Sequence, residues 1–386
     1  MRILFCMSCL LPMSLSAQVS TLEALVETTP IPAGFSDSDD AAIWKHPKDS
    51  NKSLILGTSK YDEDGQGGLG VYDLEGRQLQ FFAGSKLNSV DIIKNVAVAS
   101  NRSENALDIY RIRQGKVNFL TRTVLKDSQG KAFEPYGLCL AEAADDDDDV
   151  RVYLPTKSGL LYEYTFDDEY QAELEATYDL AALVRPVQDA FIQSVVTKET
   201  QAEGEMDELQ ENLDERFILE GCVFDARTQK LYVGMENFGI WSLSTAAAKP
   251  IPKLVIPVQG SWTDIEQWGK PGVPRVTDDI EGMDILHANG RSYLLFSSQG
   301  ISEFTLYDLT NLTWLGNFKI TFGASDAITF TDGLAVQSGA LGQRYPEGVL
   351  VVHDDENTQP DGTLAPANYK VISLADLWKI FPKTGN

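Results

Sequence analysis

A strand pattern that recurs along the chain is clear in Gly68-Leu-Gly-Val-Tyr-Asp-Leu-Glu-Gly-Arg-Gln-Leu-Gln-Phe-Phe82. An aromatic residue is flanked by alternating aliphatic residues, and a polar turn follows it. A period of two is typical of strands that bury one face, so the stretch predicts a strand, a turn and a second strand.

The same pattern recurs along the chain at Ala106–Leu120, Gly159–Phe166, Gly239–Leu243 and Phe304–Phe318. A second, more apolar type of strand precedes most of these stretches, at Ser53–Gly57, Asn95–Ser100, Val150–Leu154, Lys230–Gly234, Ser292–Phe296 and Gly348–Val352. Six strands of the second type, most of them followed by the first pattern and separated by irregular loops, predict an all-β fold, a six-bladed β-propeller. Two stacked β-sandwiches are the alternative. In a propeller, the N-terminal strand expected within Leu22–Pro32 would close the ring by pairing into the last blade.

Two stretches interrupt the pattern. Residues Asp145–Asp149 are five consecutive aspartates, which we interpret as a solvated charge run rather than a calcium store. Thr197–Arg216 is polar, with apolar residues at helical spacing, and predicts an inserted surface helix. Nothing indicates a second domain, so residues 18–386 are expected to form one.

Charge and the N-terminus limit the partners. The chain has 57 Asp and Glu against 32 Lys and Arg, a net charge of −25, which argues against nucleic acid and anionic membranes. Residues 1–17 contain one basic residue, a short apolar run and a small-residue end, as secretory signal peptides do. We therefore expect an exported monomer, periplasmic or extracellular, that does not span a membrane.

Two cysteines remain after the expected signal peptide, Cys139 and Cys222. Both lie in apolar, strand-like stretches, so buried free thiols are the first interpretation. A disulfide is the alternative in an oxidising compartment, and two positions in a sequence cannot decide between them.

The motifs of covalent catalysis are missing. The three histidines (His46, His287 and His353) lie in neither a phosphohistidine signature nor zinc-protease spacing. The sequence also contains no Gly-x-Ser-x-Gly elbow and no cysteine in a phosphate loop. A water molecule activated by metal ions is the remaining route to hydrolysis.

Acidic residues recur at the starts of predicted strands. Asp279 and Glu281 flank Ile280, and in a strand they would share one face, where a hard cation relieves their repulsion. Acids at comparable positions elsewhere are Asp39, Asp40, Glu220, Glu236, Asp326 and Asp332. Because inner strands of a propeller start near the central channel, these acids predict a site for several calcium ions.

Three basic residues follow the second type of strand in three successive blades. They are Lys60, Arg102 and Lys157. Their point and forked positive charges suit phosphate oxygens.

Seven motifs together resemble the β-propeller phytases and span most of the chain in the order of that family. They are Asp39-Asp40-Ala-Ala-Ile-Trp44, Gly68-Leu-Gly-Val-Tyr-Asp-Leu-Glu-Gly76, Leu87-Asn-Ser-Val-Asp-Ile92, Ala99-Ser-Asn-Arg-Ser-Glu104, Asp279-Ile-Glu-Gly282, Ser297-Ser-Gln-Gly300 and Tyr345-Pro-Glu-Gly348. The resemblance implies a six-bladed propeller, several Ca²⁺ ions and stepwise, calcium-dependent release of phosphate from myo-inositol hexakisphosphate (phytate), a 3-phytase type of activity.

The resemblance also implies roles for individual residues. The implied calcium ligands are Asp39, Asp40, Asp91, Tyr136, Glu220, Glu236, Asp279, Glu281, Gln299 and Asp326. The implied substrate contacts are Lys60, Arg102, Lys157 and Asn88, and the implied catalytic residues are Lys60, Arg102, Lys157, Asp279 and Glu220.

The chain departs from the family pattern at four positions. Ala41 replaces a proline, Tyr61 a second lysine, Ser89 an asparagine and Ser158 an acid. The loss of a lysine removes charge from the phosphate cleft. Two other functions stay open at this stage: a different calcium-dependent propeller hydrolase, such as a lactonase, and a non-catalytic or weakly active propeller that binds inositol phosphates.

Overall fold

The computed structural model describes residues 19–32, 34, 37–61, 67–142, 150–186, 217–247, 249–258, 276–277 and 279–383. The predicted signal peptide, the aspartate run and the predicted helix at 197–216 lie outside these residues. Among the residues described, no helix is both long and apolar enough to cross a membrane.

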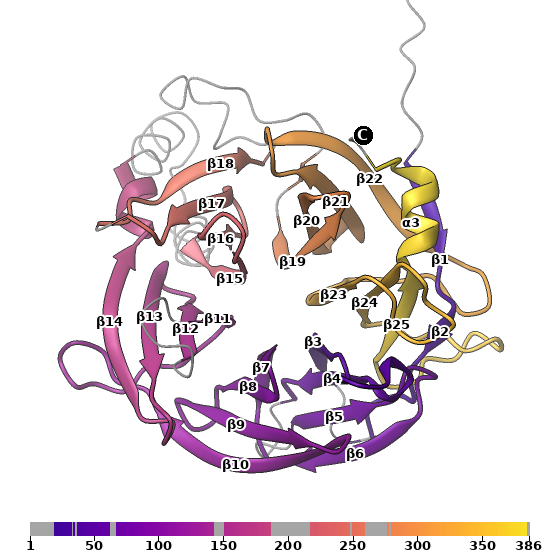
Figure 1. Cartoon of the computed structure of the whole chain (residues 1–386), viewed down its shortest axis with the longest axis horizontal. Helices are drawn as coiled ribbons and strands as arrows, with labels where there is room; N and C mark the ends of the chain where they lie inside the picture. Colours follow the sequence, from indigo (N-terminus) through magenta and orange to yellow (C-terminus); the bar gives the residue numbers. More distant parts are fainter. Residues whose placement is uncertain are drawn as a thin grey trace, which may run out of the picture.

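The strands form six sheets arranged as the blades of a β-propeller (Figure 1). Blade one contains β3 (Ser38–Trp44), β4 (Leu54–Ser59), β5 (Gly68–Tyr72) and β6 (Gln78–Ala83). Blade two contains β7 (Leu87–Ile93), β8 (Val96–Asn101), β9 (Ala106–Arg113) and β10 (Lys116–Val124). Blade three contains β11 (Cys139–Glu142), β12 (Val150–Pro155), β13 (Leu160–Phe166) and β14 (Ala172–Asp179). The prediction of a six-bladed propeller is therefore confirmed.

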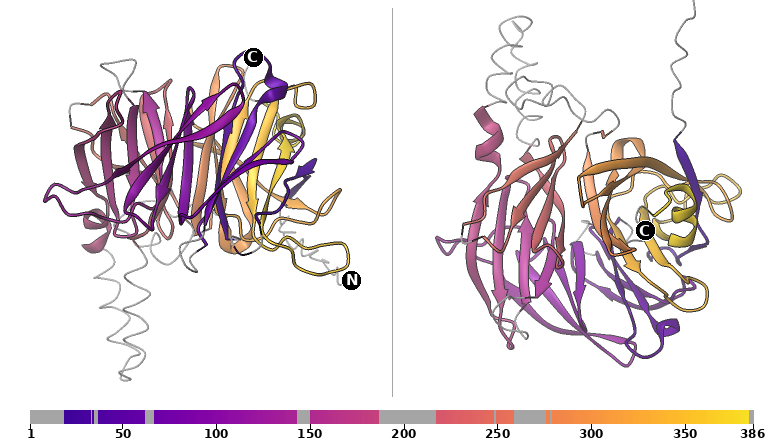
Figure 2. Two further views of the ribbon diagram at one scale, coloured as in Figure 1. Left: turned by 90° about the horizontal axis from the view of Figure 1, so that it is seen from below. Right: turned by 45° about the horizontal axis from the view of Figure 1, so that its top comes forward.

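The other three blades repeat the plan. Blade four contains β15 (Leu219–Asp225), β16 (Lys230–Met235), β17 (Gly239–Ser244) and β18 (Lys253–Pro257). Blade five contains β19 (Ile280–Ala288), β20 (Arg291–Ser298), β21 (Glu303–Asp308) and β22 (Thr313–Thr321). Blade six contains β23 (Leu334–Ser338), β24 (Gly348–Asp354) and β25 (Asn368–Ser373). The first strand of each blade lies nearest the centre, and the blades stand side by side in a disc (Figures 1 and 2).

Burial explains the two strand patterns seen in the sequence. The second strands are mostly apolar because both of their faces are covered; every residue of β4 and β24 is buried. The outer strand β14 alternates between half-buried and exposed residues, as expected for a strand with one face in solvent. All six predicted second strands coincide with β4, β8, β12, β16, β20 and β24.

The N-terminal stretch joins two blades. Strand β1 (Ser20–Glu23) runs parallel to β22 of blade five, and β2 (Val26–Glu27) pairs antiparallel with β25 of blade six. Helix α3 (Leu374–Ile380) follows β25 and packs its Leu377 into the core shared by blades five and six.

The two cysteines are bonded to each other. Cys139 on β11 and Cys222 on β15 form a disulfide with their Cα atoms 5.6 Å apart. The first interpretation of the sequence, two free thiols, is wrong because the first strands of neighbouring blades lie side by side around the channel. That proximity depends on the ring and cannot be read from two isolated positions.

Candidate metal and phosphate site

The first strands of several blades carry a β-bulge at the same place. The strand register shifts around Asp39 in β3, Asn88 in β7, Glu220 in β15 and Glu281 in β19. A bulge re-aims the side chain that it carries. In these four blades a polar side chain is thereby presented at the end of the channel.

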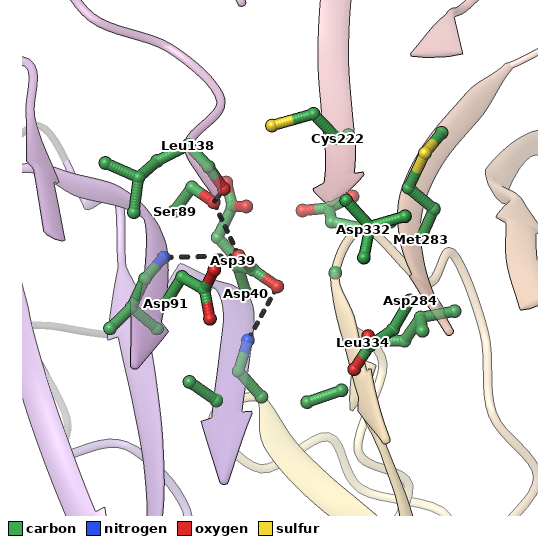
Figure 3. Close-up of a pocket in the computed structure, with 18 of the residues that line it drawn as sticks. Asp39, Asp40, Ser89, Asp91, Leu138, Cys222, Met283, Asp284, Asp332 and Leu334 are labelled. Atoms are coloured by element: carbon green, nitrogen blue, oxygen red, sulfur yellow. Dashed lines mark hydrogen bonds between the residues drawn. The ribbon is translucent and has the colours of Figure 1, made fainter. Parts of the chain in front are cut away.

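The strand pairing identifies the equivalent position in all six blades. Equivalent pairs between first and second strands are Ala42 with Leu56, Asp91 with Val98, Cys139 with Tyr153, Val223 with Tyr232, Asp284 with Leu295, and Ala335 with Val351. We call six residues the entry set, one from each blade, each lying three positions before the first member of its pair. They are Asp39, Asn88, Tyr136, Glu220, Glu281 and Asp332. All six side chains are buried, and all but Tyr136 line a central cavity of about 250 Å³ (Figure 3).

Close packing between blades explains the glycines that follow entry-set residues. A Cβ atom on Gly137 would lie 1.8 Å from the carbonyl oxygen of Glu220, and one on Gly221 would lie 1.8 Å from that of Glu281. Any side chain there would force neighbouring blades apart. The repeated Glu-Gly pair therefore joins a site carboxylate to a contact between blades.

A second set of side chains lies at the ends of the second strands. We call six further residues the exit set, one from each blade, each lying four positions after the second member of its pair. They are Lys60, Arg102, Lys157, Glu236, Gln299 and Asp355. Blades one to three thus contribute cations, and blades four to six contribute carboxylates and an amide. The end of the channel is divided into a basic half and an acidic half.

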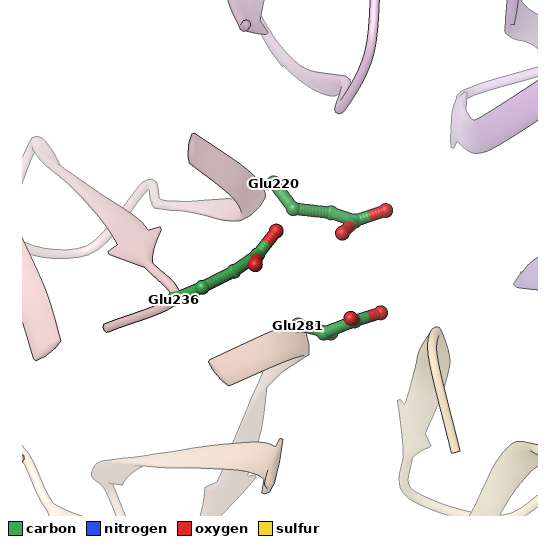
Figure 4. Close-up of side chains that lie close together, drawn as sticks. All are labelled: Glu220, Glu236 and Glu281. Atoms are coloured by element: carbon green, nitrogen blue, oxygen red, sulfur yellow. The ribbon is translucent and has the colours of Figure 1, made fainter. Parts of the chain in front are cut away.

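Three glutamates meet in the acidic half. Glu220, Glu236 and Glu281 each offer an oxygen atom within 4.8 Å of the others, and all three are buried (Figure 4). Burial, and then the charge of Glu220, raises the pKa of Glu281 well above its ordinary value. Burial likewise raises the pKa of Glu220. Three buried carboxylates this close favour either protons or a cation.

The donor atoms of this group suit a hard cation. All are carboxylate oxygens, the ligand type that Ca²⁺ prefers. Oε2 of Glu220 is buried and has no hydrogen-bond partner among the described residues. A divalent ion would satisfy that oxygen and offset the repulsion between the glutamates.

Lys60 links the basic half to the acids. Its ammonium lies 2.7 Å from Oδ2 of Asp332 and 3.0 Å from Oδ2 of Asp39. Burial opposes the charge on Lys60, but Asp39 and Asp332 outweigh it and raise the pKa of the lysine well above its ordinary value. Lys60 is therefore charged and lies between the first and last blades.

Arg102 and Lys157 share one aromatic residue. The guanidinium carbon of Arg102 lies 5.0 Å from the centre of the Tyr136 ring, and Nζ of Lys157 lies 4.7 Å from it. Cations are attracted to the face of such a ring. Burial, and then Glu220, raises the pKa of Tyr136 beyond the physiological range, so the phenol is neutral.

Asn88 connects the two halves. Its Oδ1 accepts a hydrogen bond from Nη1 of Arg102 at 3.0 Å, and its Nδ2 donates to Oε1 of Glu220 at 3.0 Å. Nε of Arg102 donates to Glu134 at 2.6 Å. These bonds orient the guanidinium, and neither of them uses Nη2.

Asp279 lies differently from the prediction. Its φ is +65° and β19 begins only at Ile280, so the expectation that Asp279 and Glu281 share a strand face is wrong. The left-handed backbone at Asp279 and the bulge after Ile280 break the regular alternation that would place the two side chains on one strand face. The backbone carbonyl of Asp279 accepts a hydrogen bond from the backbone N–H of Gln299 at 2.9 Å. The side-chain Nε2 of Gln299 donates a hydrogen bond to Oδ1 of Asp332.

Asp40 and Asp91 line the cavity but are engaged by the backbone. The oxygens of Asp40 accept the amides of Ala41 and Val90, and one also accepts the hydroxyl of Ser89 at 2.6 Å. Burial raises the pKa of Asp40 to about 7.

The bonds of Asp91 cross to the next blade. Its Oδ1 accepts the amide of Ile92 at 2.6 Å, and its Oδ2 accepts that of Leu140 in blade three at 2.8 Å. Burial raises its pKa to about 6. Asp284 repeats this arrangement between blades five and six, where it accepts the amides of Ile285 and Val336, each at 2.6 Å.

Among the residues that the structure describes, Asp326 lies outside the group of three glutamates. It forms an ion pair with Lys370, a fully buried lysine on β25 that also pairs with Asp354 at 2.7 Å and Glu27 at 3.5 Å. The positive charge beside Asp326 thus comes from the chain itself.

The chain is similar to known proteins over most of its length. A family profile described as Phytase matches residues 6–175 and 179–383. This chain belongs to the phytase family. It is accordingly a phosphoric monoester hydrolase. A curated member, 3-phytase of Bacillus subtilis (strain 168), is 30% identical over 366 residues, which cover 91% of this chain and 82% of that protein.

Two solved structures show only remote likeness to this family member. A protein from Lactobacillus plantarum has a TM-score of 0.46 and 14% identity, covering 86% of this chain and 84% of its own. A functionally unknown protein from Desulfotomaculum acetoxidans DSM 771 has a TM-score of 0.42 and 9% identity, covering 72% and 70%. Neither likeness adds to the fold assignment.

Two residues of the site were left out of the predicted ligand set. Asp332 completes the entry set in blade six, and Asp284 lines the cavity opposite Asp91. Sequence signals exist for Asp332, because Asp332-Gly333 has the same form as the two Glu-Gly pairs. Asp284 follows Glu281 at the same spacing as Asp91 follows Asn88.

Proposed function

We propose that this phytase-family chain releases phosphate from myo-inositol hexakisphosphate in a calcium-dependent reaction with water as the nucleophile. The observation that carries the proposal is the division of the exit set into a basic and an acidic half at one end of the channel. Lys60, Arg102 and Lys157 follow the second strands of blades one to three, whereas Glu236 follows that of blade four and lies beside Glu220 and Glu281 of the entry set. A polyanionic ester and the cations that neutralise it fit such a divided site.

The glutamate group is the proposed centre of calcium binding. Glu220, Glu236 and Glu281 supply oxygen donors within reach of one ion, and Asp39 and Asp332 supply further carboxylates around the same cavity. Tyr136, Asp279 and Gln299 are proposed as further ligands from their motifs. Asp40 and Asp91 are proposed as ligands too, although their oxygens already accept backbone amides.

Bound calcium supplies two things at such a site: a lower pKa for a bound water, and charge that stabilises the phosphoryl oxygens. The chain's own residues do the rest. Lys60, Arg102 and Lys157 bind substrate oxygens, and the forked guanidinium of Arg102 suits two oxygens of one phosphate. Asn88 and Glu134 hold that guanidinium in place.

Water is the proposed nucleophile because of what the side chains at the site are. The entry and exit sets contain carboxylates, amides, cations and a phenol, and none of these is a serine or cysteine. The phenol of Tyr136 is held neutral by burial, which suits a hydrogen-bond donor better than a nucleophile.

The proposed setting is outside the cytoplasm, with the chain acting as a monomer of one domain. The Cys139–Cys222 disulfide supports export, because disulfides persist in oxidising compartments. The apolar N-terminal residues 1–17 support it independently.

Phosphate release from phytate, measured with millimolar calcium and again with excess chelator, tests the proposal. We expect release with calcium and none with chelator, restored when calcium is added back. Binding without release would favour a non-catalytic inositol phosphate binder. Release that is indifferent to chelator would overturn the metal mechanism. A lactone substrate measured in parallel separates the lactonase alternative.

A further inference from the structure

The seam between blades three and four is closed differently from the two seams that carry an aspartate at the equivalent position. Asp91 joins blades two and three by accepting the amide of Leu140, and Asp284 joins blades five and six by accepting that of Val336. Strand pairing places Cys139 at the same position as these two aspartates. In this seam a disulfide to Cys222 takes the place of the hydrogen bond.

The chain link across this seam is long. Residues 180–218 connect β14 to β15, whereas residues 84–86 connect β6 to β7 and residues 125–138 connect β10 to β11. A longer link constrains the two blades less, because the entropy of chain closure grows with length. A covalent bond compensates most where the link is longest.

The disulfide lies beside the candidate site, because Cys222 lines the central cavity. Tyr136 precedes Cys139 by three residues, and Glu220 precedes Cys222 by two. Gly137 packs so tightly against Glu220 that no Cβ fits between them. Small shifts at this seam therefore move both entry-set residues relative to each other.

We propose that the Cys139–Cys222 disulfide is a positioning element that holds Tyr136 against Glu220 and so preorganises the calcium site. This rests on the proposed calcium-dependent function. Reduction would separate the blades at their inner edge while the rest of each sheet stays paired. Calcium affinity would then fall because the chain must order Glu220 when the ion binds.

The test uses the full mature chain in two redox states. Tris(2-carboxyethyl)phosphine delivers two electrons to the disulfide; the S–S bond breaks, two thiols form with protons from water, and the phosphine becomes its oxide. Calcium binding by calorimetry is measured before and after, with thiols counted. We expect the dissociation constant for calcium to rise about tenfold on reduction.

Two double variants make the test specific. Cys139→Ala with Cys222→Ala removes the bond and should match the reduced protein, without responding to the phosphine. Cys139→Asp with Cys222→Ala places a carboxylate at the position of Asp91 and Asp284, where it can accept the amide of Phe224. That variant should recover most of the calcium affinity without a disulfide.

Hydrogen exchange supplies a readout independent of calcium and turnover. In the calcium-free protein, amides of Tyr136–Leu140 and Leu219–Val223 should exchange faster after reduction, while those of β24 stay unchanged. Unchanged calcium affinity in the folded, reduced protein would overturn the proposal, as would failure of the folded aspartate variant to recover it. If the oxidised protein itself neither binds calcium nor releases phosphate, the proposed function fails instead.

Discussion

Lys60 joins the first and last blades at the end of the channel, because its ammonium lies 2.7 Å from Oδ2 of Asp332. The same ammonium lies 3.0 Å from Asp39 of its own blade. Lys60 therefore neutralises two buried carboxylates that would otherwise repel each other. A residue that we assign to phosphate binding also stabilises the site without calcium.

Replacement of Lys60 by methionine should destabilise the calcium-free protein by roughly 2–4 kcal/mol, because two buried carboxylates lose their partner. Calcium should restore more stability to this variant than to the wild type. Urea unfolding with chelator and with calcium measures both effects. Lys131→Met, at an exposed lysine, is the matched control. Equal losses in the two variants would contradict the assignment.

Glu281→Gln should have the opposite effect on the calcium-free protein. Burial and the neighbouring Glu220 raise the pKa of Glu281, so removing its charge relieves repulsion and raises stability without calcium. Calcium affinity should fall about tenfold or more, since one of three carboxylates is lost. Calorimetry and thermal unfolding measure the two changes, with exposed Glu173→Gln as the control. A variant that is less stable without calcium would argue against the repulsion.

Channel aspartates should make calcium-free stability fall as pH rises. Burial raises the pKa of Asp284 and of Asp40 to about 7, from an ordinary value of 3.8. Between about pH 4 and pH 7 the folded state therefore binds more protons than the unfolded state, and stability declines across that window. Urea unfolding in chelator at pH 5, 6, 7 and 8 should show the decline. Asp284→Asn should make it shallower; an unchanged slope would exclude Asp284 as a source.

The fold was predictable from the sequence because strand periodicity is a local property. The apolar second strands coincide with β4, β8, β12, β16, β20 and β24. Local pattern could not show the bulges that turn Asn88 and Glu281 into the channel, since these depend on the register with the neighbouring strand. For the same reason the left-handed backbone of Asp279 was missed.

Contacts between distant segments were beyond the sequence. The Cys139–Cys222 bond requires two blades to stand side by side. The carboxylate of Asp326 is of the type that binds metal ions, but in the folded ring it forms an ion pair with Lys370. The resemblance to a family had already pointed to Lys60, Arg102 and Glu236 as site residues. Strand pairing then showed that each of them occupies the same position in its own blade.

Lys370→Met should destabilise the protein by about 3–5 kcal/mol, because Asp326 and Asp354 would keep buried charges without a partner. The loss of stability should be the same with added calcium and with chelator, because the charge that is removed belongs to the chain and not to a bound ion. Urea unfolding under both conditions measures it, and Lys253→Met at an exposed site is the control. Complete rescue by calcium would instead mean that the emptied position takes an ion.

Arg102→Ala should separate catalysis from calcium binding. The guanidinium contacts Asn88, Glu134 and the Tyr136 ring, and it has no contact with the three glutamates of the metal group among the described residues. We therefore expect kcat/KM for phytate to fall about 100-fold or more, as when a donor to a developing anion is removed. The rise in melting temperature on adding calcium should stay at the wild-type value.

Two further variants complete this test. Arg102→Lys keeps the charge but loses the forked geometry, so it should recover only part of kcat/KM. Arg113→Ala, at an exposed arginine of the same blade, should leave turnover unchanged. If Arg102→Ala abolished the calcium-dependent stabilisation as well, the residue would be structural. The substrate contact would then have to be sought at Lys60 and Lys157.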